Sequence, residues 1–587
     1  MDIESELQQG ILCQRAGRLG DAARHYKAVL TQEPKNVDAL NLMSVLAITA
    51  GDFQMATALA RNAVVEQPEW FLSHINLGNA MQGLGRLDDA IDSFQKAVTL
   101  NPSSAESFLN LSDALNQAGR HGEAADMAVK CILISPEMSN AHVNFGNALL
   151  GLDSPGEAVE AYSKAARLDP GNDLAWLNMG LAYAAMGTFD AAIENLNRSI
   201  TLDDSAYKRF NLGNAYYAIH RFEDAVAAFE KCIELQPNHM DSRVNLGALL
   251  RDMGRLDDAE ATMRAALDFA PIEPELHWNL ALILLTKGDY VEGWQEYEWR
   301  WQTPHFAKFN RDFPMLEWQG EPLEGKTILV HAEQGFGDAL EMCRFVPMLA
   351  DRGATVSLEC RPGLGRLFQT LDPRITVFEA GSQALPVTDF HVPLMSLPHW
   401  FATTLDSIPS KTPYLGIPEG VAAFPEISTD KGLKIGVVWS GSDTRRDNQP
   451  RSFKPHDLLE LPDCRLFSLQ KGEAAATASD LFDHGLMVDL GPRLGDFADT
   501  AAAINAMDLV ISADTAVAHL AGALGKPVWI LLPNPTSGFL WMTDRSDSPW
   551  YPTARLFRQK TPGDWSDVIA EIHHVLESGA LAKLSKT

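Results

Sequence analysis

The sequence predicts two successive architectures, an α-solenoid of tandem helical hairpins and then an α/β half made of two doubly wound lobes. The first prediction comes from prolines that recur every 34 residues through much of the first half. The second comes from short β-rich apolar runs that alternate with helical stretches after residue 326. A chain of 587 residues also exceeds what one hydrophobic core usually supports. Separate domains are therefore expected.

A repeating unit fills about the first 301 residues. A Leu-Gly pair, or a relaxed version of it, recurs in phase with the prolines. In several units a turn glycine follows seven residues after this pair. An alanine, which has a small side chain, follows five residues after the turn glycine. In one unit these positions are Leu77-Gly78, Gly85 and Ala90. Glycine allows close helix packing and proline cannot continue a helix, so each unit should be two short antiparallel helices. The repeat positions hold Pro34, Pro68, Pro102, Pro136, Pro170, Asp204, Pro237 and Pro271.

These residues resemble the consensus of the tetratricopeptide (TPR) repeat, and the resemblance covers residues 1–301. It comprises eight repeats and a degenerate ninth unit that ends in Trp294, Tyr297, Trp299 and Trp301. One such unit cannot bury its own apolar stripe, so neighbouring units stack into a superhelix with a long concave face. A face of that kind binds an extended partner.

An asparagine ladder is expected along that concave face, because asparagine recurs at one position of the repeat. An amide offers both a donor and an acceptor, so it could bind the backbone of an acceptor protein regardless of its sequence. The TPR half of the nucleocytoplasmic O-GlcNAc transferase resembles this arrangement. The alternative is that these amides bond within the array. The ladder consists of Asn76, Asn110, Asn144, Asn178, Asn211, Asn245 and Asn279.

The second half is predicted to hold a linker at 302–325, a first lobe at 326–420 and a second lobe at 432–580. Alternating strands and helices are typical of parallel sheets, whose ligands bind beyond the carboxyl ends of the strands. A helix is expected from about 338 to 352. Strands are expected at 327–332, 355–359, 433–439, 466–469, 509–512 and 528–532.

A glycine-containing loop follows the first of these strands and reads Glu333-Gln334-Gly335-Phe336-Gly337-Asp338. Gly335 and Gly337 would let the backbone approach a donor molecule closely. Asp338 falls where the next helix begins. Its carboxylate is either a plain helix cap or a general base that points into the cleft between the lobes.

The second lobe carries a strand end, a tight turn and a helix start within residues 512–527. Asp514 and Thr515 are expected to cap that helix and to leave its free N–H groups aimed at the cleft. The positive end of a helix dipole is a ready site for a phosphate. His519, one turn further on, is either a packed core histidine or a ligand contact.

Other groups of this lobe could help to neutralise a phosphate. Arg451 and Lys471 are candidates, with the alternative that each lies on a solvated loop, and Ser440 could bring a backbone N–H group to the same place. Trp541, Trp550 and Tyr551 are interpreted as packing residues, with stacking on a nucleobase or sugar as the alternative. No Asp-x-Asp pair or His/Cys cluster suggests a metal site.

Taken together, the Gly-Asp loop and the Asp-Thr-x-x-x-His-Leu-x-x-Ala-Leu-Gly-x-Pro segment at 514–527 resemble glycosyltransferase family 9, the heptosyltransferases. Residues 317–575 look more closely like the catalytic half of bacterial TPR-containing glycosyltransferases, including the type that modifies flagellin. The resemblance implies a GT-B fold and an inverting, metal-independent enzyme. It places Asp338 as catalytic base and Asp514 as a sugar-contacting acid. Ala516 stands where heptosyltransferases usually carry glycine, which weakens the case for a heptose donor.

The main hypothesis from the sequence is therefore a protein O-glycosyltransferase. It would take a nucleotide sugar as donor and Ser or Thr of an acceptor protein held by the repeats, with flagellin as the best single acceptor. One alternative is a TPR scaffold with an idle transferase half. The other is an enzyme that acts on a lipid or polysaccharide.

Composition sets further expectations. A formal net charge of −29 argues against a nucleic-acid partner, because phosphate contacts need clustered lysine and arginine. The acidic start of the chain lacks the basic segment of a signal peptide, and no apolar run approaches the roughly 18 residues of a membrane span. Six scattered cysteines without a CxxC pair are expected to be reduced. A cytoplasmic protein is expected.

Overall fold

The computed structural model describes residues 2–428, 432–441, 451–535 and 538–578. The chain packs into two compact units, residues 1–239 and 240–587. This division falls inside the repeat array and not near residue 301, where the sequence suggested a boundary. The last two helical hairpins therefore pack with the α/β half.

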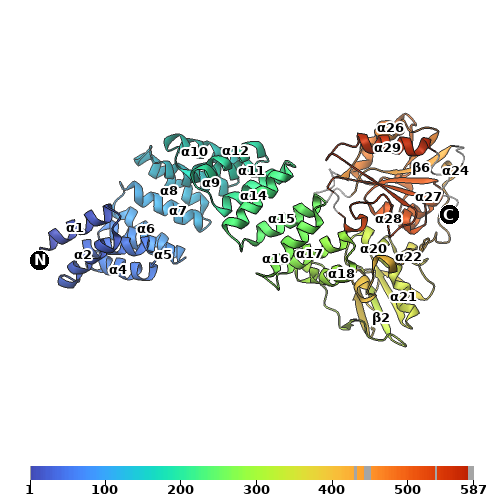
Figure 1. The fold of residues 1–587 in the computed structure, drawn as a ribbon, viewed down its shortest axis with the longest axis horizontal. Coiled ribbons are helices and arrows are strands. Elements are labelled where there is room, and N and C mark those ends of the chain that lie inside the picture. Colours follow the sequence, from blue (N-terminus) through green and yellow to red (C-terminus); the bar gives the residue numbers. More distant parts are fainter. Residues whose placement is uncertain (1, 429–431, 442–450, 536–537, 579–587) are drawn as a thin grey trace. The chain divides into compact units, whose positions relative to one another are not determined.

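The first unit contains seven helical hairpins among its described residues (Figure 1). In each hairpin an apolar stripe of the first helix faces one on the second, and consecutive hairpins stack on one another. The helices are α1 (Ile3–Arg15), α2 (Leu19–Gln32), α3 (Val37–Thr49), α4 (Phe53–Glu66), α5 (Phe71–Gly83), α6 (Leu87–Leu100), α7 (Ala105–Gln117), α8 (His121–Ile134), α9 (Ser139–Gly151), α10 (Pro155–Leu168), α11 (Asp173–Ala185), α12 (Phe189–Leu202), α13 (Ala206–Ala218) and α14 (Phe222–Leu235).

The glycine of the Leu-Gly pair makes room for a side chain of the second helix of its own hairpin, which is an aromatic ring in several hairpins. A Cβ atom at Gly78 would lie 2.4 Å from the ring of Phe94, and one at Gly146 would lie 2.5 Å from the ring of Tyr162. Both rings are fully buried. The turn glycine has a separate role, because Gly85 ends its helix with a φ angle of +72°, which favours glycine.

The second unit opens with two more hairpins, and the last helix of the second hairpin buries three aromatic side chains. Its helices are α15 (Met240–Asp252), α16 (Leu256–Leu267), α17 (Pro274–Lys287), α18 (Tyr290–Tyr297) and the short α19 (Pro304–Ala307). Tyr290, Trp294 and Tyr297 of α18 are at most 2% exposed and share one hydrophobic core with both α/β lobes. Trp550 of the second lobe donates from Nε1 to the Tyr290 hydroxyl over 3.1 Å.

The first lobe is a five-stranded parallel sheet of order β1-β5-β2-β3-β4. Part of the expected linker belongs to it, because β1 pairs with β5 and Trp318 is fully buried. The expected helix at 338–352 starts earlier, at Phe336, and is divided in two by a 3-10 turn at 343–345. The elements are β1 (Leu316–Glu317), β2 (Thr327–His331), α20 (Phe336–Met342), α21 (Val346–Asp351), β3 (Thr355–Cys360), α22 (Gly365–Phe368), β4 (Ile375–Glu379), β5 (Phe390–Pro393) and α23 (Leu397–Trp400).

The second lobe is a six-stranded parallel sheet of order β11-β10-β9-β6-β7-β8. Its central strands β9 and β10 are buried on both faces, as in a doubly wound sheet. The elements are α24 (Pro425–Ser428), β6 (Leu433–Val438), β7 (Cys464–Ser468), α26 (Ser479–Asp483), β8 (Met487–Asp489), α27 (Phe497–Asn505), β9 (Leu509–Ala513), α28 (Ala516–Ala523), β10 (Val528–Leu532), β11 (Ala554–Arg558) and α29 (Ser566–Glu577).

Each sheet has one point where the direction of winding reverses. In the first sheet the chain runs from β2 through β3 to β4 and returns to β5 on the other side of β2. In the second sheet it runs from β6 through β7 to β8 and returns to β9 on the other side of β6. Ligands of doubly wound sheets bind at such switch points, beyond the carboxyl ends of the strands.

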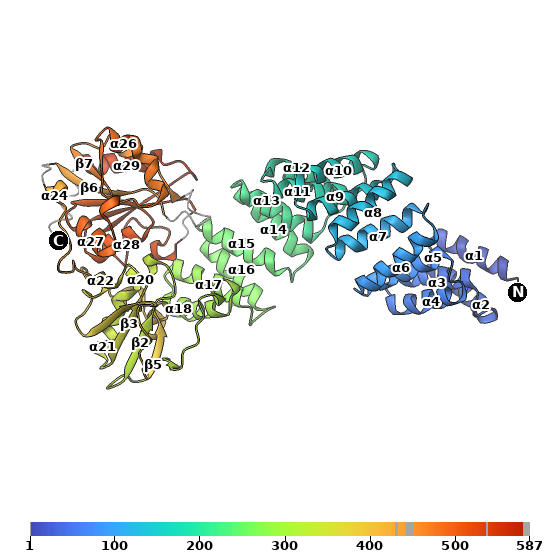
Figure 2. The same cartoon turned by 180° about the vertical axis from the view of Figure 1, so that it is seen from behind.

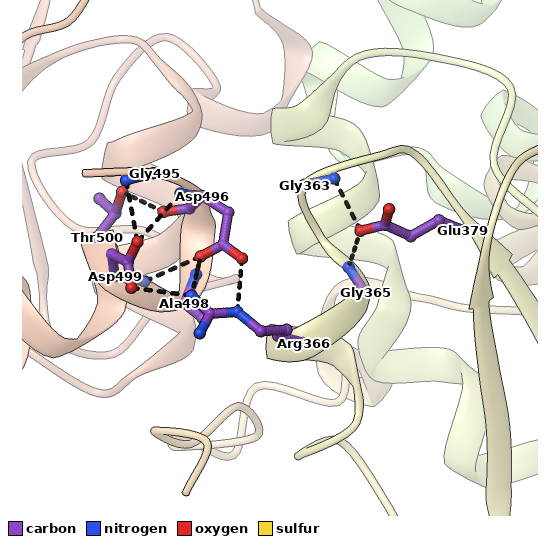
Figure 3. Close-up of polar contacts among 9 residues, drawn as sticks. All are labelled: Gly363, Gly365, Arg366, Glu379, Gly495, Asp496, Ala498, Asp499 and Thr500. Atoms are coloured by element: carbon purple, nitrogen blue, oxygen red, sulfur yellow. Dashed lines mark hydrogen bonds and ion pairs between the residues drawn. The ribbon is translucent and has the colours of Figure 1, made fainter. Parts of the chain in front are cut away.

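A set of polar contacts joins the two lobes at one end of the interface (Figure 3). Arg366 of α22 bonds to Asp496 and Asp499 at the start of α27, at 2.7–2.8 Å. Asp496 also accepts the N–H groups of Ala498 and Asp499. The same carboxylate therefore caps α27 and joins it to Arg366 of the first lobe. The Phe497 N–H donates to the Gly363 carbonyl over 3.2 Å. These contacts hold the two lobes side by side.

All six cysteines lie in described residues, and none forms a disulfide. Five are buried and Cys464 is half-buried. Over the described stretches, no helix has the length and apolar character needed to cross a bilayer.

The position of the unit boundary predicts which fragments fold. A fragment of residues 240–587 should unfold cooperatively. A fragment of 302–587 should not, because it exposes the lobe surfaces that bury α18 and leaves the buried carboxylate of Glu333 without Arg300. Breaking a buried pair alone costs about 3–5 kcal/mol. Near-UV circular dichroism and thermal melting of both fragments would test this, and equal melting temperatures would contradict it.

Candidate functional site

Asp338 lies at the switch point of the first sheet, on the first turn of α20. Its Oδ2 atom accepts the N–H of Gly335 over 2.9 Å. The carboxylate therefore caps its own helix, as one interpretation of the sequence expected. The side chain remains half-buried.

The start of α28 lies at the switch point of the second sheet, after β9. Thr515 occupies the N-cap position, but its side chain makes no capping bond, contrary to the expectation from the sequence. Its hydroxyl lies 3.1 Å from the hydroxyl of Ser512. The first N–H groups of any helix lack intrahelical acceptors, so this end has the electropositive character that suits an anion.

These two helix starts meet. A Cβ atom at Gly337 would lie 3.0 Å from Cδ2 of His519 and 3.9 Å from Cα of Ala516. Both cartoon views place α20 and α28 side by side (Figures 1 and 2). The absence of a side chain at Gly337 thus permits the contact that brings the two switch points together.

His519 is buried among acidic and aromatic groups. Its Nδ1 atom lies 3.0 Å from the Tyr551 hydroxyl and 3.8 Å from Oε2 of Glu341, and its Nε2 atom lies 3.9 Å from Oδ1 of Asp514. Burial lowers the pKa of His519, against the opposing effect of the Asp514 and Asp338 carboxylates. The imidazole contact with Gly337 and Asp514 places His519 in the site, where it also packs on Trp541.

Glu341 is a fully buried acid beside this histidine. Neither of its carboxyl oxygens has a hydrogen-bond partner among the described residues. Burial raises the pKa of Glu341 to about 8; Arg344 opposes that shift, and the charges of Asp338 and Asp514 add to it. Arg344 is itself held by Tyr414 and by the Trp550 carbonyl, at 2.8 and 2.7 Å.

Arg451 lies at the other side of the α28 start. Its guanidinium donates to the Asp514 carbonyl and lies 3.3 Å from Oδ2 of the same residue. It is a buried residue, so the alternative of a solvated loop does not hold for it. Ser440 is also buried and donates its backbone N–H to Gln470 over 3.0 Å.

Lys471 differs from the other proposed donor-binding residues. It lies one strand further out, after β7, and is exposed. Its ammonium donates to the carbonyl of Leu494. Its expected role at the phosphate stays a prediction.

An open cavity of about 200 Å³ borders this site. Its walls come from the repeat hairpins, through Gly254, Leu282 and Thr286, and from the second lobe, through Gly538 and Gln559. A Cβ atom at Gly538 would lie 3.8 Å from Oδ2 of Asp514. The cavity therefore offers space next to the α28 start, with one wall supplied by the repeats.

The asparagine ladder makes bonds within the array, as the alternative interpretation expected. Asn211 and Asn279 donate to carbonyls of their own helices, and Asn245 occupies the same repeat position in α15. Four others donate to a neighbouring hairpin: Asn76 to Asn41, Asn110 to Asn79, Asn144 to Leu109 and Ser112, and Asn178 to Asn147. These bonds support the structural interpretation, and a role in acceptor binding stays a proposal.

Sequence reasoning missed Glu341 and Arg344 altogether. Their spacing was a usable signal, because Asp338, Glu341 and Arg344 recur every three residues and so lie near one another on one helical face. A polar stripe inside an otherwise apolar helix marks a buried network.

Trp541 and Trp550 are fully buried packing residues, as interpreted, whereas Tyr551 is buried and also contacts His519. Among the described residues, no cluster of His, Cys, Asp or Glu is placed to hold a metal ion.

Comparison with known proteins finds tetratricopeptide repeats in the first half of the chain. Tetratricopeptide repeat families match residues 7–69, 75–129, 146–187, 174–205, 210–274 and 249–298. The DnaJ homolog subfamily C member 3 of Mus musculus is 26% identical over 105 residues, which are 18% of this chain and 21% of that protein. The thermophilic TPR protein TTC0263 of Thermus thermophilus is 24% identical over 31% of this chain and 98% of its own, with a TM-score of 0.28.

Glycosyltransferase family 9 (heptosyltransferase) matches residues 463–539, a segment that runs from β7 through α28 and β10 and contains Asp514, Thr515 and His519. Protein FlbA of Caulobacter vibrioides is 25% identical over 400 residues, which cover 63% of this chain and 65% of FlbA, just under two thirds of that protein. This chain is thus a tetratricopeptide-repeat protein with a glycosyltransferase-like second half.

Proposed function

We propose that this protein is an inverting, metal-independent O-glycosyltransferase that moves a sugar from a nucleotide donor to a Ser or Thr hydroxyl of an acceptor protein. One observation carries the proposal. Asp338 of the first lobe and the electropositive start of α28 of the second lobe both border the buried His519, within one packed unit. A carboxylate base and an anion site on facing lobes are the two groups that such a transfer needs.

The start of α28 is the proposed site of the donor phosphate. Its backbone N–H groups and the buried guanidinium of Arg451 supply positive charge without a metal ion. Asp514, which Arg451 already pairs, is the proposed acceptor of a hydrogen bond from a sugar hydroxyl. The backbone N–H of Ser440, just after the neighbouring strand β6, is already bonded to Gln470, so its side chain is the second proposed contact of the phosphate.

Asp338 is the proposed base. The acceptor oxygen attacks the anomeric carbon from the face opposite the phosphate, while the hydroxyl proton moves to the carboxylate. The bond from the anomeric carbon to the phosphate oxygen breaks, and the nucleotide leaves with the electron pair. The space beside Gly337 is filled by His519, so of the two loop glycines Gly335 is the proposed contact of the donor.

The repeats are the proposed grip for the acceptor protein. Stacked TPR hairpins present an extended concave face, and the last two hairpins form one wall of the cavity next to Asp514. Holding the acceptor near the cleft raises its effective concentration at the site. Flagellin is the acceptor that we propose to test first.

Replacing Asp338 with Asn tests the base. The amide keeps an oxygen for the Gly335 N–H, so the helix cap should survive. The variant should bind donor with an unchanged thermal shift and lose roughly 10²–10⁴-fold in kcat. The matched control is Asp52→Asn, which alters the helix-capping carboxylate at the start of α4 and should leave transfer unchanged. Normal turnover in the Asp338 variant would refute the assignment.

The buried acid Glu341 gives a pH dependence whose sign can be worked out. Its pKa is about 8 in the folded protein and near 4.5 in water. As pH rises between these values, the unfolded chain ionises this group and the folded protein does not, so folding stability falls. Glu341→Gln removes that loss, because the amide does not titrate.

The stability gained by Glu341→Gln, relative to the native chain, should therefore grow from pH 5 to pH 8 by on the order of 2–4 kcal/mol. Urea unfolding of both proteins at the two pH values measures it. A gain that is the same at pH 5 and pH 8 would show that Glu341 ionises as readily in the folded protein as in the unfolded chain.

Removing the first unit tests the acceptor grip. The fragment 240–587 keeps the whole compact second unit, including the cavity. Its thermal shift with donor should match that of the full chain, while transfer to the acceptor protein should fall by about tenfold or more. A fragment that glycosylates its protein target at the full rate would exclude a role for residues 1–239 in acceptor binding.

A further inference from the structure

The loop that carries Asp338 is anchored by the last repeat helix. Gln334 donates from Nε2 to the Tyr297 hydroxyl over 2.9 Å. Glu333, the residue before it, pairs through Oε1 with Nη2 of Arg300 at 3.2 Å. Tyr297 ends α18 and Arg300 lies in the 3-10 turn that follows it, so both anchors come from the end of the repeat array.

These anchors are deeply buried. Tyr297 is 2% exposed and Arg300 is 0% exposed. Burial raises the pKa of Tyr297, with Arg300 opposing the shift and Asp338 adding to it, so the phenol lies within electrostatic reach of the proposed base. Glu333 also accepts the N–H groups of Leu394 and Met395, which follow β5 at the switch point.

Arg300 links further parts of the same site. It donates to Ser396 over 2.7 Å and to Glu298 over 2.7 Å, and its guanidinium stacks over the Tyr297 ring. A buried cation from the repeats thus holds the loops after both β2 and β5, the two strands that form the first switch point.

The sequence of the loop explains why such anchors are needed. Gly335 and Gly337 give the segment between β2 and α20 little intrinsic rigidity. A base must be held within a fraction of an ångström of its working position. The fixed points are therefore Glu333 and Gln334 on one side and the helix cap of Asp338 on the other.

We propose that Tyr297 and Arg300 are positioning residues for transfer: the last tetratricopeptide helix holds the Glu333–Asp338 loop, and through it the catalytic base, in place. This inference rests on the proposed function only for its effect on turnover. The clamp on the loop is a separate physical claim with its own measurement. On this view the repeats take part in the chemistry as well as in binding.

A double-mutant cycle between Tyr297 and Gln334 tests the proposal. Tyr297→Phe and Gln334→Met each remove the hydrogen bond and keep most of the side-chain volume. Arg300 is a poorer target, because its removal leaves Glu333 buried without its cation and could prevent folding. The full-length chain is used throughout, with a nucleotide sugar and the protein acceptor that supports turnover.

Each single variant should lower kcat about three- to tenfold, as the loss of one buried hydrogen bond implies. KM for the donor and the melting temperature should stay close to those of the native chain. The double variant should be no slower than the singles, because both changes remove the same bond. The matched control is Tyr162→Phe, which removes a buried phenol bonded to Asn147 at 2.8 Å in the first unit and should leave kcat unchanged.

Hydrogen exchange of the amides in residues 333–338 gives a readout that does not need activity. Exchange there should be faster in Tyr297→Phe than in the native chain, and unchanged in Tyr162→Phe. Unchanged loop exchange would overturn the clamp. Faster exchange with unchanged kcat, or losses in kcat that add in the double variant, would overturn the positioning role. If the native chain transfers no sugar at all, the proposed function fails, and the exchange result still decides the clamp.

Discussion

Close contact between two helix starts is the constraint on which the site depends. The starts of α20 in the first lobe and α28 in the second pack closely at Gly337, where a Cβ atom would lie 3.0 Å from the His519 ring. That contact brings the switch points of two separate sheets to one place. The ion pairs of Arg366 with Asp496 and Asp499, at the start of α27, also join the two lobes.

The site has more acidic groups than basic groups that are free to bind a ligand. Asp338, Glu341 and Asp514 surround one buried histidine, and the nearby cations, Arg344 and Arg451, are each bonded within the protein. Burial raises the pKa of Glu341 to about 8, and the neighbouring charges of Asp338 and Asp514 add to the shift, so Glu341 holds its proton up to about pH 8. A neutral Glu341 lessens the negative charge that an incoming phosphate would meet. The acidic cluster and the proposed anion site are therefore compatible near neutral pH.

Packing, more than the sequence pattern, decides where the repeats end and the α/β half begins. Helices α15–α18 have the repeat pattern, yet they pack in one unit with the α/β half, and the apolar faces of α17 and α18 lie in the same core as both lobes. Large aromatic side chains such as Trp294 are buried in that core, and burying one such side chain stabilises the fold by about 1.5–3 kcal/mol. Because α18 then continues into the turn that holds Arg300, its packing also determines where the loop of Asp338 lies.

The sequence by itself determined the two architectures, the repeat phase and six of the eleven strands in the described part of the chain, because these follow from local periodicity. It also located Asp338, Asp514 and His519, whose neighbours along the chain mark a strand end and a helix start. Only the tertiary structure decided what surrounds them. Burial makes Glu341 a titrating acid near pH 8 and makes Arg300 a structural cation, and burial depends on residues tens to hundreds of positions away in the chain. Tertiary packing also decided the unit boundary at residue 239, because repeats with similar sequences bury their apolar faces against different parts of the chain.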